Sequence, residues 1–132
     1  MKITGAAVVA LLASTTTAAS WNCHRSGGDG HGRLKHLHSE FNKRFGSSRL
    51  HIAAGQCYYT TCYDHYFGVC NRSSKAKWEV SGDRNDAKNA NPGSGSGCAI
   101  NPSPIQEPYL TYIFSHSKDI SLGGGRNDIR RC

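Results

Sequence analysis

The chain has 132 residues, of which 16 are lysine or arginine and 9 are aspartate or glutamate, so its formal net charge at pH 7 is +7. This length predicts a single domain and excludes a multidomain protein. The positive charge favours acidic partners, such as anionic lipid headgroups, cell-wall polyanions or nucleic acid.

Residues 1–20 predict a secretory signal peptide. Lys2 supplies the positive n-region, Ile3–Ala13 forms a short apolar run, and small residues lead to a cleavage site near Ala19 or Ser20. The apolar run is too short to cross a bilayer. We therefore expect a secreted, extracellular protein whose mature domain spans residues 21–132.

All six cysteines lie in the mature part of the chain. An even number in a small exported protein predicts a disulfide framework, here of three bridges. The spacing does not choose among the pairings, and we predict that Cys23 and Cys132 join the two ends of the domain. The six residues are Cys23, Cys57, Cys62, Cys70, Cys98 and Cys132.

Residues 33–46 predict an amphipathic helix. Four apolar side chains recur at spacings of three and four and share one face: Leu34, Leu37, Phe41 and Phe45. Gly46 stands where a C-cap glycine belongs, and Glu40 lies four residues before Arg44, a favourable ion-pair spacing. We expect the apolar face to pack on a sheet. The alternative is a basic helix that lies on a membrane surface.

Lys43-Arg44 is also a dibasic pair of the kind that processing proteases cut, but its place inside the helix argues against cleavage.

The period changes to two after Arg49. Alternation predicts strands at residues 50–53 and 77–80, and Tyr109–Phe114 is apolar on both faces, which is typical of a central strand. Residues 81–97 contain almost no apolar side chain and predict a flexible surface loop. The predicted fold class is therefore α+β: one small disulfide-stapled domain, with one amphipathic helix packed on an antiparallel β-sheet.

The stretch CYYTTCYDHYFGVC, residues 57–70, predicts a stapled hairpin. Residues 56–60 and 66–71 are β-prone and are joined by a turn around residues 62–65. This register places Cys57 opposite Cys70, although Cys98 is an alternative partner for either. We expect Tyr63 and Tyr66 to point outward, where exposed aromatic side chains are candidates for a binding surface.

The cysteine spacing argues against a metal site, because it lacks the paired ligand steps of tetrahedral zinc centres. We therefore expect no metal and no cofactor. Asn71-Arg72-Ser73 is an N-glycosylation sequon, which makes Asn71 a candidate glycosylation site.

Lys77-Trp78-Glu79-Val80 and Tyr112–Lys118 resemble two strands of the guanyl-specific ribonucleases and their ribotoxin relatives. The resemblance implies an endoribonuclease with Glu79 as base, His116 as acid, and Lys77 or Arg126 as phosphate contacts. The catalytic arginine of that family is missing, because Cys98-Ala99-Ile100 follows the proline-glycine loop. An inactive descendant is therefore an alternative to an active enzyme.

The signal peptide, the six cysteines, the Trp-Asn-Cys opening at 21–23 and Gly-Val-Cys-Asn at 68–71 are similar to the secreted cysteine-rich effectors and killer-toxin-like proteins of filamentous fungi. This resemblance implies a monomeric, non-enzymatic virulence protein. Its partner would be a host or competitor protein, a wall polymer or an acidic surface. RNA and a membrane surface are the partners implied by two alternatives, the ribonuclease and a basic antimicrobial protein. We expect the effector-like function.

Overall fold

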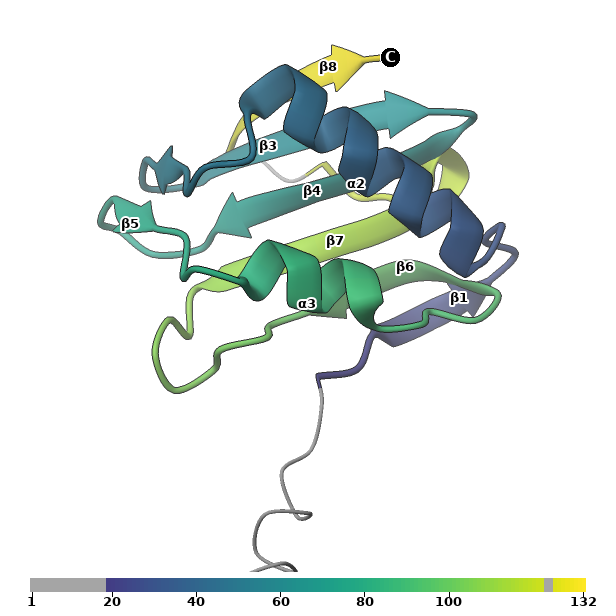
Figure 1. Cartoon of the computed structure of the whole chain (residues 1–132), viewed down its shortest axis with the longest axis horizontal. Coiled ribbons are helices and arrows are strands. Elements are labelled where there is room, and N and C mark those ends of the chain that lie inside the picture. The colour runs from purple at the N-terminus through teal and green to yellow at the C-terminus, as the bar shows by residue number, and fades with distance from the viewer. Residues whose placement is uncertain (1–18, 123–124) are drawn as a thin grey trace, which may run out of the picture.

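The computed structural model describes residues 19–122 and 125–132, so all but the last two residues of the predicted signal peptide lie outside the described part. The domain has two layers, a six-stranded sheet and two helices that cover one of its faces (Figure 1). A separate two-stranded sheet lies at one end of the domain. The elements are β1 (Asn22–Ser26), α2 (His31–Phe45), β2 (His51–Ile52), β3 (Gln56–Cys62), β4 (His65–Asn71), β5 (Lys77–Trp78), α3 (Asp83–Asn89), β6 (Gly95–Ile100), β7 (Leu110–His116), the 3-10 turn η1 (Ser117–Asp119) and β8 (Arg126–Arg131).

The large sheet has the strand order β1-β6-β7-β4-β3-β8. Its neighbours are antiparallel except β3 and β8, which run parallel. The predicted α+β domain is therefore correct, but the sheet is not antiparallel throughout. The reason is that the chain after β7 returns to the side of the sheet where β7 began. β8 therefore runs in the same direction as β7, which is also the direction of β3. The prediction of a central strand is confirmed, because β7 lies between β6 and β4.

Helix α2 matches the predicted amphipathic helix. Leu34, Leu37 and Phe41 are fully buried, and the ring of Phe41 lies 5.6 Å from that of Phe67 on β4, measured between centroids. Gly46 has a φ of 88° and donates its N–H to the Asn42 carbonyl, as a C-cap glycine does. The apolar face packs on the sheet, so in this fold it is not available to a membrane. Among the described residues, neither helix is long and apolar enough to span a bilayer.

Helix α3 corrects the prediction that residues 81–97 are one flexible loop. Ala87, the only apolar residue of the helix, is fully buried. The Trp21 indole donates hydrogen bonds to the carbonyls of Ala87 and Ala90 at 3.0 and 3.1 Å. These tertiary contacts hold a polar seven-residue segment that has no helical apolar period of its own.

The predicted stapled hairpin is confirmed. β3 and β4 pair with Cys57 opposite Cys70, and these two residues form a disulfide. The turn is tighter than expected, because only Tyr63 and Asp64 separate the strands. Both adopt positive φ, 50° and 58°, as a two-residue hairpin turn of type I′ requires.

The prediction that Cys23 pairs with Cys132 is wrong. Cys23 is bonded to Cys98 and Cys62 to Cys132. The topology explains the difference. Cys23 lies on β1 at one edge of the sheet, whereas Cys132 directly follows β8 at the other edge. The two ends of the domain are therefore separated by the width of the sheet.

Candidate functional site

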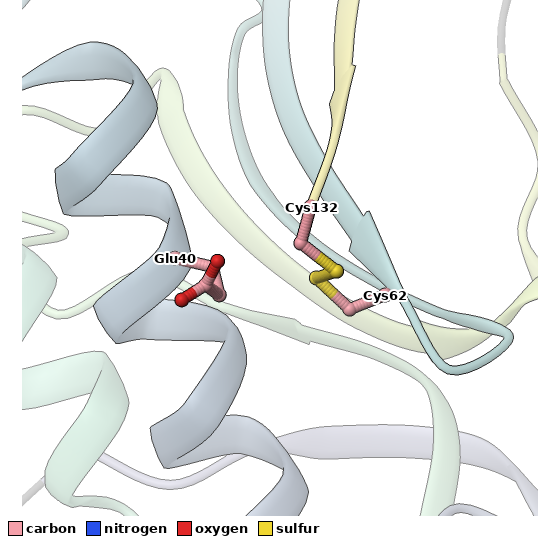
Figure 2. Close-up of side chains that lie close together, drawn as sticks. All are labelled: Glu40, Cys62 and Cys132. Atoms are coloured by element: carbon pink, nitrogen blue, oxygen red, sulfur yellow. A yellow bond between two sulfur atoms is a disulfide. The ribbon is translucent and has the colours of Figure 1, made fainter.

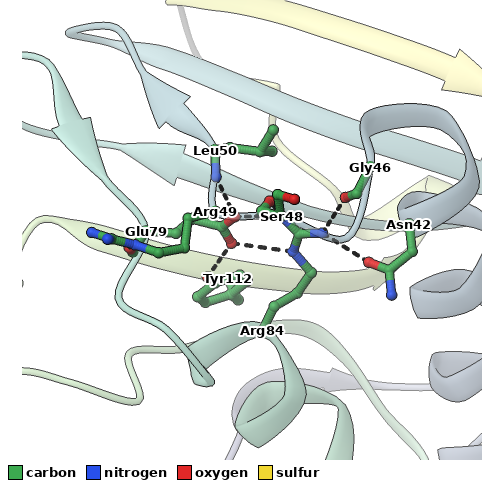
Figure 3. Close-up of polar contacts among 8 residues, drawn as sticks. All are labelled: Asn42, Gly46, Ser48, Arg49, Leu50, Glu79, Arg84 and Tyr112. Carbon is green, nitrogen blue, oxygen red and sulfur yellow. Dashed lines mark hydrogen bonds and ion pairs between the residues drawn. The ribbon is translucent and has the colours of Figure 1, made fainter.

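Glu79, the candidate base, lies buried at the centre of a polar network (Figure 3). Both of its carboxylate oxygens accept hydrogen bonds from the Arg84 guanidinium. The Leu50 N–H donates to one oxygen at 2.9 Å and the Tyr112 hydroxyl to the other at 2.5 Å. Burial, and after it the negative charge of Glu79, raises the pKa of Tyr112, which keeps this hydroxyl protonated as a donor. The lone pairs of the carboxylate are thus engaged by neighbouring donors.

The Arg84 guanidinium joins this network to the end of α2. It donates to the Asn42 side chain at 2.8 Å and to the carbonyls of Gly46 and Ser48 at 2.6 and 3.3 Å. Two elements far apart in the sequence, α3 and the C-terminal end of α2, are thereby held together. The geometry of Glu79 and Arg84 is that of a structural ion pair.

The four ribonuclease candidates do not meet in one site. Glu79 bonds Tyr112 near the start of β7, whereas His116 ends that strand four residues later, about 13 Å away at the usual rise of a strand. Lys77 lies on β5 with its Nζ 3.8 Å from the Glu107 carboxylate. Arg126 starts β8 and donates its N–H to Gly55.

His116 instead lies beside a second histidine. The ring centroids of His65 and His116 are 4.9 Å apart. His65 is buried, its Nε2 accepts a hydrogen bond from the Asp29 N–H at 3.2 Å, and its Nδ1 lies 2.8 Å from the Tyr63 carbonyl. His116 accepts a hydrogen bond from the Lys118 N–H. This pair supports the end of the β3–β4 hairpin.

Glu40, Cys62 and Cys132 bring potential metal-ligand atoms within 4.8 Å of one another (Figure 2). The two sulfur atoms are bonded to each other, so neither is a thiolate that could bind a metal. Glu40 forms ion pairs with Lys43 at 2.9 Å and Arg44 at 2.7 Å. The hydrogen bonds that these two side chains donate lower the pKa of Glu40, and the bond from Lys43 has the larger effect. The chemistry of this group is that of a disulfide beside a neutralised carboxylate.

Asn71, the glycosylation candidate, is only 2% exposed. Its Nδ2 donates hydrogen bonds to the carbonyls of Ile52, Ala53 and Lys75 at 2.9, 3.2 and 2.8 Å. A glycan is attached through this same nitrogen. In the folded domain Asn71 therefore anchors the chain between β4 and β5 and is not accessible for modification.

An exposed aromatic and basic surface lies on the small sheet. Trp78 is 53% exposed, and the exposed ring of His51 stacks on it at 4.5 Å between centroids, with 17° between the planes. The Arg49 guanidinium lies 5.7 Å from the Trp78 ring. These three residues, Arg49, His51 and Trp78, are called the Trp78 surface below. The neighbouring Lys77 points to the other side of β5, where its Nζ lies 5.5 Å from the ring of Tyr109, which is 48% exposed.

The pairing of β2 with β5 explains why Trp78 points outward. His51 pairs with Trp78 and Ile52 with Lys77. Ile52 is fully buried and fixes the orientation of β2, so its neighbour His51 is exposed, and Trp78 with it. The Glu79 backbone carbonyl accepts a hydrogen bond from Arg49 Nε at 2.6 Å and so positions this guanidinium. The polar network around Glu79 thus supports the Trp78 surface.

The Trp78 surface was not among the predicted sites. Alternation at residues 77–80 indicated a strand but not which side would be buried. The predicted exposure of Tyr63 is correct, since this residue is 61% exposed at the hairpin turn, with the Arg33 guanidinium 4.4 Å from its ring. Tyr66 is only partly exposed and packs edge-on against Tyr59.

The chain matches no family model, no curated protein and no solved structure.

Proposed function

We propose that the protein is a secreted effector or toxin-like virulence protein, without enzymatic activity, that binds an acidic protein on the cells of another organism. The Trp78 surface is the proposed contact. The observation that carries the proposal is the exposure of Trp78 between His51 and Arg49. Large aromatic side chains and arginine dominate binding energy at protein interfaces.

Two further properties support this function. The three disulfides fit an extracellular protein and hold the scaffold rigid, which lowers the entropy lost on binding. The cation beside Trp78 favours an acidic target, because the Arg49 guanidinium lies 5.7 Å from the centre of its ring.

The test is saturation binding of the labelled, oxidised protein to intact plant and yeast cells, with Trp78→Ala as the variant. Tyr63→Ala is the matched control, because it removes an exposed aromatic side chain from the hairpin turn, outside the Trp78 surface. We expect Trp78→Ala to weaken binding at least tenfold and Tyr63→Ala to leave it unchanged. Equal binding by wild type and Trp78→Ala would refute the role of this surface.

Two accompanying measurements identify the class of target. Protease treatment of the cells should abolish binding if the target is a protein, whereas binding that persists indicates a wall polymer. Incubation with RNA tests the ribonuclease alternative. We expect no cleavage by wild type, because the carboxylate of Glu79 is engaged and far from His116. Cleavage that His116→Ala abolishes would contradict the non-enzymatic proposal.

A further inference from the structure

The outer edge of β8 is an open strand edge. The sheet of the described residues ends at β8, which pairs with β3 alone (Figure 1). Arg126 and Cys132 donate their N–H groups to Gly55 and Thr61, on the β3 side, both at 3.2 Å. Since peptide groups alternate along a strand, the N–H groups of Ile129 and Arg131 and the carbonyl of Ile129 point away from β3.

This edge is held in place at its C-terminal end. The disulfide between Cys62 and Cys132 ties it to β3. The Arg130 guanidinium donates to the Arg44 carbonyl at 2.6 Å, and Arg44 Nε donates to the Arg131 carbonyl at 2.7 Å. The Arg131 carbonyl is therefore occupied, whereas the N–H groups of residues 129 and 131 face outward on a strand that is already ordered. An ordered edge loses little entropy when another strand joins it.

The charge of this edge is strongly positive. β8 carries three arginines against one aspartate, and Asp128 is already paired with Arg130 at 3.1 Å. Lys43 and Arg44 of α2 share Glu40, so this helix adds positive charge beside Arg130 and Arg131. Ile129, 37% exposed, is the apolar side chain in the middle of the strand. A second copy of the chain would bring like charges together at this edge, whereas an acidic strand would be attracted.

We propose that the outer edge of β8 binds an extended acidic segment of a partner protein by β-strand addition. The backbone of the segment pairs with Ile129 and with the N–H of Arg131, and its carboxylates lie beside Arg126 and Arg130, which share one face of β8. Main-chain hydrogen bonds supply affinity in this mode of recognition, and the side chains supply specificity. The inference is independent of the Trp78 surface. Charged edge strands also serve to prevent unwanted pairing, and the experiment separates these two roles.

The probe is a capped nine-residue peptide of alternating glutamate and valine, titrated into the isotopically labelled, oxidised protein at low salt. We expect amide exchange at Ile129 and Arg131 to slow at least tenfold at saturation, with no change at Asp128, which already faces β3. A peptide with lysine in place of glutamate should not bind. Exchange at Ile129 that stays unchanged in the presence of bound peptide would overturn the proposal.

Ile129→Pro is the decisive variant. Proline removes the outward N–H but breaks no bond to β3, which is why edge strands tolerate it. Ile129→Val is the matched control, since it keeps the N–H and nearly the same shape. We expect at least a tenfold loss of affinity for Ile129→Pro and none for Ile129→Val. Equal affinities would show that charge alone holds the peptide and would refute strand addition.

A variant of the peptide covers the case in which Ile129→Pro does not fold. Replacing its valines by proline and methylating the backbone nitrogens of its glutamates removes the donors from both edges of the peptide and leaves its charge unchanged. We expect the proline-containing peptide to bind at least tenfold more weakly to the wild-type protein. Equal binding of the two peptides, or shift changes that centre on Trp78 and not on β8, would contradict the inference.

Discussion

The guanidinium of Arg84 donates hydrogen bonds to both carboxylate oxygens of Glu79 inside the domain. The pair joins α3 to the segment between Trp78 and Val80, and the Glu79 backbone holds Arg49 in place. A residue that resembles a catalytic base is therefore part of the support of the proposed binding surface. Its contribution is to the stability and shape of the domain.

Glu79→Ala should destabilise the protein strongly. The substitution leaves the Arg84 charge buried without its partner, which typically costs about 3–5 kcal/mol. We expect a loss of this size in the free energy of unfolding, measured by urea denaturation of the oxidised protein. The double variant Glu79→Gln with Arg84→Met should lose clearly less, because no buried charge remains. A loss below about 1 kcal/mol for Glu79→Ala would show that the pair is dispensable.

His38 should make the stability depend on pH. Burial, and after it the charges of Lys88 and Arg84, lowers the pKa of His38 from 6.5 to about 4. Below pH 6.5 the unfolded chain takes up a proton that the folded domain does not, so stability falls as the pH drops from 6.5 towards 4. The full effect is on the order of 3 kcal/mol.

The measurement is urea denaturation at several pH values, with His38→Leu as control. This variant cannot take up the proton, and its stability should change less between pH 6.5 and 4. Parallel curves for wild type and His38→Leu over this range would contradict the assignment.

The hairpin turn stores backbone strain. Asp64 has a φ of 58°, a conformation that glycine adopts more readily than other residues. We expect Asp64→Gly to raise the free energy of unfolding by about 0.5–1 kcal/mol. Gly55→Ala is the opposite test. Gly55 has a φ of 68°, and the space where an alanine Cβ would lie is open. Backbone strain alone should therefore lower the free energy of unfolding of the Gly55→Ala variant. Thermal unfolding measures both, and the same sign of change in both would contradict this interpretation.

The disulfides should differ in their contributions. Cys62 and Cys132 close a loop of 70 residues, whereas Cys57 and Cys70 close one of 13. Loop-closure entropy predicts losses of about 4 and about 3 kcal/mol when each pair is replaced by alanine. Urea denaturation of the two double variants checks this order. Peptide mapping of the oxidised wild type should recover the same two bridges together with Cys23–Cys98, and a Cys23–Cys132 peptide would contradict the topology.

Features that depend on near neighbours in the chain were predictable from the sequence. The apolar period of α2 and its C-cap glycine indicated a helix that packs on a sheet, because contacts three and four residues apart determine which face is apolar. The β3–β4 hairpin was predictable for the same reason, since its turn sets the register that brings Cys57 opposite Cys70. The even number of cysteines predicted three bridges, but the one pairing that we predicted, Cys23 with Cys132, is wrong.

Only the tertiary structure decided the remaining features. Helix α3 depends on Trp21, 66 residues away from the Ala87 carbonyl to which its indole donates. The bridge between Cys23 and Cys98 depends on the pairing of β1 with β6, and the exposure of Trp78 depends on the burial of Ile52 in the neighbouring strand. Each of these contacts joins distant parts of the chain, so no local period or turn encodes it. The sequence determined the helix–sheet domain and the register of its hairpin, and the long-range packing decided which side chains became support and which became surface.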